Sequence, residues 1–268
     1  AYVTPAFIQK WQTIAKHGLV AVTQTEVSIF DQAQKFQLTG YIGSVFPMIQ
    51  QNHQQFAILI PVKGQNQQAL LKTGIIAASG ASQMPLPATP KNFVKIINQL
   101  KNRPYGWGGK FFFNDCSKEM KSLFTPFAIW LPRNSSQQAK LNSILDFSKN
   151  TVDARINLLT EKAHPLMTLI YIGRHIILYV GKKDLGEQLQ APITYQNLWG
   201  LSPKNRDKRY VIGQSVFLPL LKTYPEHPSL VSHAGETLFQ LIFLDQLNPN
   251  SDSPDVFVSK FIAAEPSE

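Results

Sequence analysis

Residues 103–120 decide the fold of this chain and have the sequence RPYGWGGKFFFNDCSKEM. They contain Cys116, which is the single cysteine among 268 residues. The second half continues into a helical pattern, and Asn114 and Asp115 stand where that helix should begin, as residue types that commonly cap helices. A thiol in the first turn of a helix lies near the positive end of the helix dipole, which favours the thiolate. The stretch therefore predicts a nucleophilic cysteine with a lowered pKa, of the kind that cysteine hydrolases use.

The composition is that of a folded chain without internal disulfides. Hydrophobic residues make up 44% of the sequence, which is enough to bury one large core or two smaller ones. A single cysteine leaves a free thiol. No apolar run approaches the roughly 18 residues that a transmembrane helix needs, so no membrane span is expected. No signal peptide is visible at Ala1, where the sequence opens directly into an amphipathic segment.

The net charge of +9 is a weak sign of nucleic-acid binding, because charged residues form only 16% of the chain. The densest basic segment, residues 204–209, is short and is expected to be a solvated loop. A basic surface would also favour approach to an anionic polymer or a cell envelope. We expect no nucleic-acid partner, and we expect no metal or other cofactor, because the sequence contains neither a metal-ligand cluster nor a phosphate-binding loop.

Two domains joined by a linker are predicted. Residues 1–85 should form a small, mostly antiparallel barrel behind an N-terminal helix at 4–17. Residues 86–102 should form a linker and a connecting helix that begins at Asn92, and the Ser-, Ala- and Pro-rich residues 79–91 mark this boundary. Five short strands are predicted in the first domain, at residues 19–23, 26–30, 40–47, 55–62 and 69–77.

The second predicted domain covers residues 103–268 and places helices before strands. A further helix should start at Ser135, and residues 142–147 are expected to be irregular or helical. The tail after Leu247 is polar and turn-rich, apart from an apolar patch at 256–263. Helices followed by antiparallel strands indicate an α+β domain. Its strands are predicted at residues 166–172, 174–180, 192–198, 209–217 and 239–244.

His175 is the strongest candidate, among six histidines, for the base that a nucleophilic cysteine needs. It opens the predicted strand RHIILYVG, although a histidine at the start of a buried strand can equally be a core residue. The next strand offers Gln196 or Asn197 to orient the imidazole, and the sequence alone does not choose between them. His233 lies in a Ser-His-Ala-Gly loop and is predicted to be a surface residue.

Four segments in order resemble the NlpC-type cell-wall peptidases, a papain-like family that cleaves peptidoglycan stem peptides. They are PYGWGG, DCS, LPRNSSQQ and GRHIILYVG, and the resemblance covers residues 103–217. The last segment departs from the family pattern because Arg174 stands between Gly173 and His175. The N-terminal part resembles the bacterial SH3-like domain of the γ-D-glutamyl-diamino-acid endopeptidase branch, through GYIGSVFP and the MPLP linker. The resemblance implies a papain-like catalytic domain, with a helix packed on an antiparallel sheet, preceded by an all-β SH3-like barrel.

The same resemblance implies roles for the reacting groups. Cys116 matches the nucleophile and His175 the general base. Gln196 aligns with the third polar position, which is usually histidine in this family, and a glutamine can still orient imidazole through its carbonyl oxygen. Tyr105 matches the tyrosine near the oxyanion.

Substrate contacts are implied as well. Asp115 and Ser117 match the pair that receives the free amino group of an N-terminal L-alanine. Trp107 lies in the segment beside the thiol, where it should help to shape the turn, and Tyr41 of the SH3-like domain could reach the cleft. Arg133 is expected to bond loop carbonyls rather than substrate.

The expected function is a cysteine endopeptidase that hydrolyses the γ-D-glutamyl-diamino acid bond of peptidoglycan stem peptides and prefers a free N-terminal L-Ala. The alternatives are a non-catalytic cell-wall-binding protein, or an amidase or acyltransferase on the same scaffold. The expected partners are peptidoglycan or muropeptides. A monomer in the periplasm or outside the cell is expected.

Overall fold

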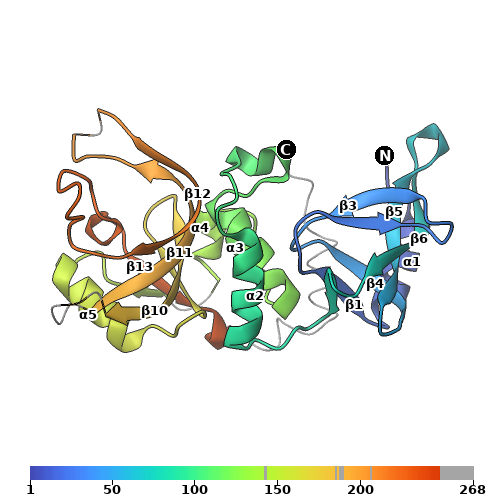
Figure 1. Cartoon of the computed structure of the whole chain (residues 1–268), viewed down its shortest axis with the longest axis horizontal. Coiled ribbons are helices and arrows are strands. Elements are labelled where there is room, and N and C mark those ends of the chain that lie inside the picture. The colour runs from blue at the N-terminus through green and yellow to red at the C-terminus, as the bar shows by residue number, and fades with distance from the viewer. Residues whose placement is uncertain (142–143, 185, 187–189, 206, 248–268) are drawn as a thin grey trace. The chain divides into compact units, whose positions relative to one another are not determined.

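A computed structural model describes residues 1–141, 144–184, 186, 190–205 and 207–247 of the chain. Two compact units are present (Figure 1). The first comprises Ala1–Gln99 with Ser122–Trp130, and the second comprises Leu100–Lys121 with the described residues from Leu131 onward. The apolar patch predicted at 256–263 and part of the basic segment at 204–209 lie outside the described residues. The domain boundaries at 85 and 102 stay predictions.

The first unit is built on a seven-stranded sheet in the order β3-β2-β6-β5-β4-β1-β7, in which every pair of neighbours is antiparallel. Residues Val20, Ile29, Ile58 and Ile76 are fully buried in its core. The side chain of Thr4 caps the N-terminal helix by accepting a hydrogen bond from Phe7 N at 3.2 Å. The elements are α1 (Pro5–Ala15), β1 (Leu19–Val22), β2 (Val27–Phe30), β3 (Phe36–Gly40), β4 (Val45–Gln51), β5 (Gln55–Lys63), η1 (Gln65–Gln67), β6 (Ala69–Ala77) and β7 (Ala81–Gln83).

Two predictions for this unit are wrong. The strand expected at 40–47 is broken by a turn, in which Ser44 N donates to Tyr41 O at 2.8 Å and Gly43 has φ of 86°. The backbone of Gly43 is in the left-handed region, which a glycine adopts without steric cost, so β3 and β4 become separate strands. The linker expected at 79–91 contributes β7, whose Ala81 is buried because β7 pairs with β1.

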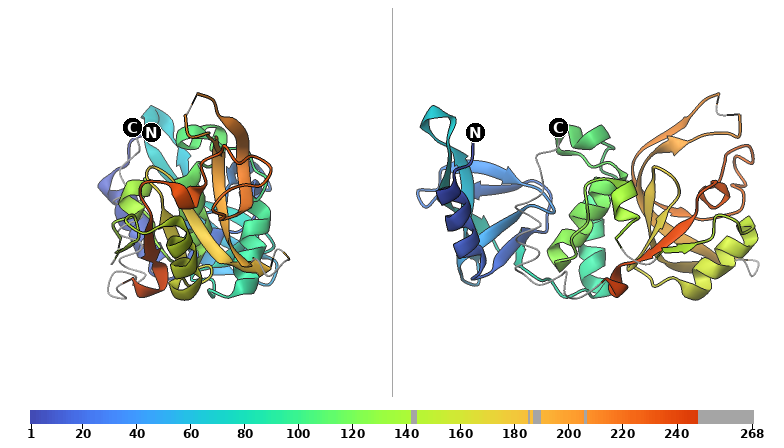
Figure 2. Two further views of the ribbon diagram at one scale, coloured as in Figure 1. Left: turned by 90° about the vertical axis from the view of Figure 1, so that its left-hand side faces the viewer. Right: turned by 180° about the vertical axis from the view of Figure 1, so that it is seen from behind.

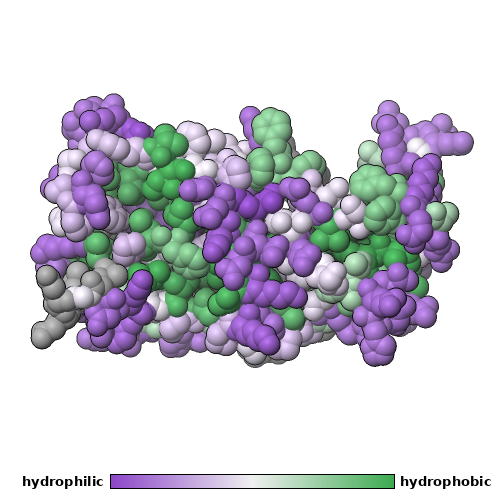
Figure 3. Space-filling model, viewed as in Figure 1, coloured by the Kyte–Doolittle hydropathy of each residue, from purple (hydrophilic) through white to green (hydrophobic). Residues whose placement is uncertain are grey.

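The connecting helix α2 (Pro90–Leu100) is confirmed. Its apolar side chains at Phe93, Ile96, Ile97 and Leu100 are all buried, as their helical spacing predicts. The Phe93 ring stacks on Phe127 with centroids 4.1 Å apart. The opposite face carries exposed Lys91, Lys95 and Asn98, and Figure 3 shows hydrophilic surface over this helix.

The second unit contains a six-stranded antiparallel sheet in the order β12-β11-β10-β9-β13-β8. Helix α5 packs against β11 and against η4, and Figure 2 shows it in yellow-green beside this sheet. Together with the helices, the sheet confirms the predicted α+β class. The bounds are η2 (Trp107–Phe112), α3 (Cys116–Phe124), η3 (Thr125–Phe127), α4 (Ser135–Gln138), β8 (Ile144–Asp146), α5 (Val152–Lys162), β9 (Thr168–Tyr171), β10 (Ile176–Asp184), β11 (Gln190–Leu201), β12 (Tyr210–Pro219), η4 (His233–Gly235), β13 (Gln240–Phe243) and η5 (Leu244–Gln246); α3 continues from the second unit into the first, and η3 belongs to the first.

One element of the second unit was predicted wrongly. Residues 144–146, expected to be irregular or helical, form the edge strand β8 and pair with β13, with Ile144 opposite Ile242. All three residues of β8 are exposed, so the strand has no alternation of buried and exposed positions. Pairing with β13, far along the chain, makes this segment a strand, and no local pattern predicts that pairing.

Candidate active site

Cys116 is the first residue of α3, as predicted, and its side chain is buried. Asp115 caps the helix, because its Oδ1 accepts a hydrogen bond from Lys118 N at 2.9 Å. The thiol lies beside the backbone amide of Ile176, the first residue of β10. Because His175 directly precedes Ile176, the predicted base is one residue away in the chain from the amide beside the thiol.

The predicted low pKa of Cys116 is wrong. Burial raises the pKa of the thiol to about 11, and the neighbouring Asp115 carboxylate raises it as well. The backbone amides of Ile176 and Ser117 lower this pKa, but their effect is the smaller one. Desolvation therefore outweighs the helix N-terminus, and the resting thiol is protonated at neutral pH.

The predicted base, His175, is a neutral imidazole at neutral pH, because its pKa is lowered. Its Nε2 lies 2.8 Å from Gln196 Oε1, and Gln196 Nε2 donates in turn to Thr194 Oγ1 at 3.2 Å. The second bond directs the carbonyl oxygen of the amide at the ring, so His175 Nε2 carries the hydrogen and Nδ1 keeps a lone pair. Burial lowers the pKa of His175, the Gln196 bond raises it, and the Arg209 charge lowers it. A neutral imidazole is the form that can accept a proton from a thiol.

Of the two orienting residues that the sequence left open, Gln196 is the one bonded to His175. Asn197 instead donates from Nδ2 to Asn114 O at 2.9 Å, which ties β11 to the residues just before Cys116. Both side chains are fully buried, and adjacent residues of a strand point to opposite faces. The alternation along β11 therefore separates the two amides.

Tyr105 and two tryptophans form an aromatic group near the thiol. The Tyr105 ring lies 5.1 Å from Trp107 and 6.0 Å from Trp199. Burial raises the pKa of Tyr105, with the nearby Cys116 and Asp115 adding to it, so the hydroxyl stays protonated and can donate. Trp107 is 57% exposed and precedes Gly108 and Gly109, whose φ values of 65° and 81° give the turn its left-handed backbone.

The carboxylate of Asp115 is bonded by Arg133. Arg133 Nη2 lies 2.6 Å from Asp115 Oδ2 and Nη1 lies 3.0 Å from Oδ1. Arg133 Nη1 also donates to Ser117 Oγ at 3.1 Å, and that hydroxyl donates to Asp115 Oδ1 at 3.2 Å. Arg133 was expected to bond loop carbonyls, so the sequence interpretation missed this bidentate pair. The two residues expected to receive a substrate amine therefore share an arginine.

A second carboxylate, Glu119, is fully buried one helical turn after the cysteine. It accepts hydrogen bonds from the Tyr195 hydroxyl, from Ser215 Oγ at 2.7 Å and from Asn114 Nδ2 at 2.7 Å. Burial raises its pKa, against the lowering effect of these donors. The sequence interpretation did not single out Glu119, and a glutamate in a short helix gives no signal of burial.

His233 was also missed, because it was predicted to lie on the surface. Its side chain is only 5% exposed, and its ring centroid lies 5.4 Å from that of His175. A surface loop was expected from the polar and small neighbours of His233. The contact arises from the packing of η4 against the sheet and has no counterpart in the local sequence.

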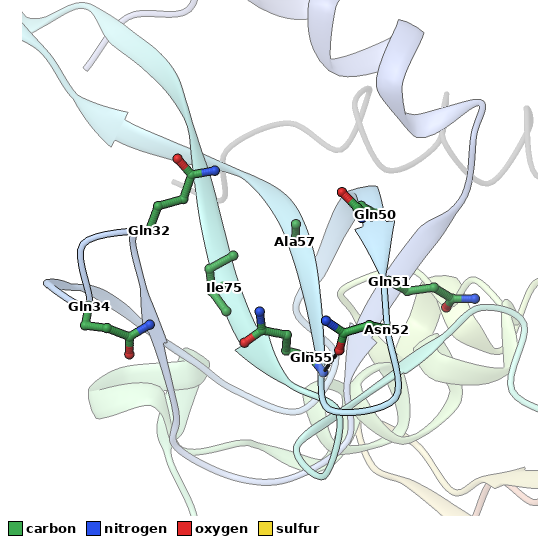
Figure 4. A pocket seen from close by; sticks show the side chains of 8 residues that line it. All are labelled: Gln32, Gln34, Gln50, Gln51, Asn52, Gln55, Ala57 and Ile75. Carbon is green, nitrogen blue, oxygen red and sulfur yellow. Dashed lines mark hydrogen bonds between the residues drawn. The ribbon is translucent and has the colours of Figure 1, made fainter.

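Tyr41 belongs to the first unit, in the turn between β3 and β4, and its role stays a prediction. That unit also has an open pocket of about 280 Å³. Side-chain amides surround it, as Figure 4 shows, and its floor is apolar. None of its lining residues can titrate near neutral pH, so the pocket is suited to binding rather than to acid–base chemistry. The lining residues are Gln32, Gln34, Gln50, Gln51, Asn52, Gln55, Ala57 and Ile75.

Among the residues that the structure describes, no group of three or more His, Cys, Asp or Glu side chains is arranged to hold a metal ion. Within the same residues, no helix combines the length and the apolar character needed to cross a membrane.

Comparison with protein-family models and with curated proteins gives no match. Among solved structures, the chain is similar to an NlpC/P60 endopeptidase from Photobacterium damselae subsp. piscicida, with a TM-score of 0.73 and 28% identity over 91% of the chain. It is also similar to an NlpC/P60 family protein from Bacillus cereus ATCC 10987, with a TM-score of 0.53 and 12% identity over 84% of the chain.

The chain spans 57% of the length of the first of these structures and 65% of the second. The second likeness, at 12% identity, concerns the fold alone. The mixed helices and antiparallel sheet are thus those of the papain-like NlpC/P60 fold, and the first likeness supports the NlpC/P60 family.

Proposed function

We propose that this chain is a cysteine endopeptidase of the NlpC/P60 type that hydrolyses peptidoglycan stem peptides between D-γ-glutamate and the diamino acid. One observation carries the proposal: the buried Cys116 thiol lies beside the backbone amide of Ile176 at the start of β10, and the preceding residue, His175, has its Nε2 bonded to Gln196 at 2.8 Å. Nucleophile, base and orienting group in this order are the parts that acyl transfer requires. The similarity to an NlpC/P60 endopeptidase supports the same reaction class.

The protonation states favour general-base attack over a preformed ion pair. His175 Nδ1 accepts the Cys116 proton as the sulfur adds to the carbonyl carbon of the γ-glutamyl bond. The oxyanion would be stabilised by the backbone amide of Cys116 and by the hydroxyl of Tyr105, which stays protonated. Collapse of the tetrahedral adduct breaks the C–N bond, and the imidazolium gives its proton to the leaving amine. Water, deprotonated by His175, then hydrolyses the thioester.

The specificity proposal concerns the amino end of the substrate. Asp115 and Ser117 would receive the amine of an N-terminal L-alanine next to the nucleophile. Because Arg133 already bonds both side chains, the amine would have to share the carboxylate with this guanidinium. Trp107, more than half exposed beside Tyr105, would supply an apolar wall.

Hydrolysis of L-Ala-γ-D-Glu-diaminopimelate by wild type and C116A tests the activity. We expect wild type to release the diamino acid and C116A to release none above background, as judged by mass spectrometry. The matched control is H164A, which removes a histidine of the same unit that pairs with Asp245 at 2.6 Å. Equal turnover by wild type and C116A would instead support the wall-binding alternative. Products joined to an added amine or alcohol would indicate an acyltransferase.

The first unit is proposed to be the SH3-like domain and to bind wall polymer. The amide-lined pocket of about 280 Å³ supports this role, because uncharged amides around an apolar floor suit a neutral, hydroxyl-rich chain such as a glycan strand. In a C116A background, Q51A/Q55A should lower binding to purified peptidoglycan severalfold. Q9A/Q12A removes two exposed glutamines of α1 and should not. Equal binding by both double variants would show that this pocket does not bind peptidoglycan.

The remaining expectations belong to the same proposal. Peptidoglycan or muropeptides would be the partners, and the chain would act as a monomer in the periplasm or outside the cell. Tyr41 would assist substrate binding.

A further inference from the structure

A second imidazole, His233, lies against the proposed general base and takes no part in the mechanism above. Its ring centroid is 5.4 Å from that of His175, with the two planes inclined by 49°. The His233 side chain is 5% exposed, and its buried Nδ1 has no hydrogen-bond partner in the described part of the chain. A buried nitrogen without a partner costs about 1–3 kcal/mol. If the residue at this position served only to fill space in the core, an apolar side chain would be more stable there.

The backbone that carries His233 is held firmly. Arg155, a buried residue of α5, donates from Nη1 to Ala234 O at 2.8 Å and to Glu236 O at 2.6 Å. Its Nε donates to Phe147 O at 3.0 Å, so the guanidinium joins η4 to the segment before α5. Ser232 Oγ accepts from Ala234 N at 3.1 Å and caps the turn. The position of the His233 ring is thus set by its backbone and not by polar contacts of the ring itself.

One hydrogen bond cannot fix the plane of an imidazole. The Gln196 bond holds His175 at Nε2 only, and by itself it does not fix the rotation of the ring about the line from Cγ to Nε2. A second contact is needed to direct Nδ1 at the thiol, since catalytic groups must be held to within about 0.5 Å of the productive geometry. The ring of His233 is in the place to supply that contact.

We propose that His233 is a positioning residue, whose imidazole packs on the His175 ring and holds it in the orientation that presents Nδ1 to Cys116. The role of this orientation rests on the function proposed above. When His175 takes the proton from the thiol, it becomes a positively charged imidazolium. The lone pair on the unbonded Nδ1 of a neutral His233 can stabilise that positive charge. A protonated His233 would oppose it.

The surroundings of His175 and His233 favour the protonation of at most one of the two imidazoles. His175 faces Gln196 on β11 and the Arg209 charge before β12, and the Cys116 thiol lies beside the amide of the next residue, Ile176. His233 faces His175 itself, and its backbone lies beside the Tyr224 hydroxyl. Burial and the His175 charge lower the pKa of His233 to about 3, so as the pH falls the proton goes to His175 first.

The test follows the His175 ring directly by NMR of ¹⁵N-histidine in the full chain, in wild type, H233A, H233F and the control H227A. His227 is exposed and lies 5.2 Å from the Tyr210 ring, so H227A also removes an imidazole from an aromatic contact. In H233A we expect His175 to lose its preference for the Nε2–H tautomer. Its pKa should rise toward the ordinary histidine value, because water enters and solvates the imidazolium. H233F keeps a ring in place and excludes water, so the tautomer should persist with a pKa at or below that of wild type.

Kinetics supply the second readout. For H233A, kcat should fall by about tenfold to a hundredfold with KM within about twofold, as for a misplaced catalytic group. H233F should lose less, and the acid limb of kcat/KM should move to higher pH in H233A alone. Unchanged His175 signals and kcat in H233A would overturn the proposal. Equal losses in H233A and H233F with unchanged His175 signals would leave His233 a merely structural role.

A replacement variant and the NMR readout separate a failure of the His233 proposal from a failure to fold and from a failure of the proposed function. If H233A does not fold, H233L fills the space without a flat ring face. In H233L the tautomer preference should be lost as in H233A, while the His175 pKa should stay at or below that of wild type because water remains excluded. If wild type hydrolyses no stem peptide, the proposed function fails, whereas the NMR comparison still decides whether His233 positions His175.

Discussion

The two carboxylates near the cysteine, Asp115 one residue before it and Glu119 three residues after it, differ in their burial and in their hydrogen-bond partners. Asp115 is at the helix cap, partly accessible, and bonded by the charged Arg133 at 2.6 Å. Glu119 is fully buried, and its hydrogen bonds within the described residues come from neutral donors on β11, on β12 and at Asn114. Asp115 also raises the pKa of the thiol, whereas Glu119 is not among the main causes of that shift. The comparison indicates that Glu119 holds helix α3 on the sheet. Asp115 instead raises the pKa of the Cys116 thiol and is the carboxylate available to a bound substrate.

The largest effect is expected from E119A, on stability. Removing the carboxylate leaves the Tyr195, Ser215 and Asn114 donors without their acceptor inside the core. Each buried group left unpaired costs about 1–3 kcal/mol, so the free energy of unfolding should fall by at least about 3 kcal/mol. Urea unfolding measures this change, and E161A, at an exposed position of α5, is the control. A loss no greater than that of E161A would contradict the anchoring role of Glu119.

The titration of Glu119 provides the next test of the same role. Because burial raises its pKa, the folded state binds the proton more tightly than the unfolded chain does. This contribution to stability is complete below the ordinary glutamate pKa and is lost as the pH rises through the folded value. Measured from pH 5 to pH 8, wild type should lose stability relative to E119Q, which cannot titrate. A constant difference between the two proteins would show that Glu119 does not change its protonation on folding.

A smaller effect is expected from R133A on the other carboxylate. Loss of the bidentate pair should cost about 1–3 kcal/mol, since hydrogen bonds between charged groups are worth roughly that much when partly buried. The comparison variant is K222A, which breaks the exposed Lys222–Asp153 pair of the same 2.6 Å length and should cost less than about 1 kcal/mol. Thermal unfolding of both variants tests the difference. Equal costs would mean that Asp115 gains nothing from its partial burial.

The smallest effect concerns the thiol itself. D115N keeps a helix-capping side chain but removes the charge that raises the Cys116 pKa, so the thiolate fraction at a given pH should increase. Iodoacetamide alkylation at pH 8 should accelerate about threefold to tenfold, the effect of a shift of half a pKa unit to one unit. E119Q should leave the rate unchanged. Acceleration in E119Q and not in D115N would reverse the roles assigned to the two carboxylates.

Sequence patterns were sufficient for the elements that carry the candidate site. The capping pair before Cys116 marks the start of α3, and the apolar run after His175 forms β10. The spacing of Phe93, Ile96 and Leu100 likewise marks the buried face of α2. These features depend on residues within one or two turns or strands of each other, so local physics determines them.

The pKa of the Cys116 thiol could not be predicted from the local sequence. A cysteine at a helix N-terminus predicts a lowered value, and this remains true of the helix taken alone. The fold buries the side chain under β10 and adds the Asp115 charge, and desolvation then exceeds the dipole. The same sequence feature is present, but its consequence for the chemistry is reversed.

The sequence by itself determined that a helix begins at Cys116 and that a strand follows His175, and it placed Cys116, His175 and Gln196 in three separate segments. The tertiary structure alone decided that Gln196 rather than Asn197 bonds the imidazole, that Arg133 bonds Asp115, and that His233 lies against His175. The physical reason is the separation along the chain of the residues that interact. Capping and periodicity involve neighbouring residues, whereas burial, charge pairing and ring contacts join segments that are brought together only when the sheet assembles.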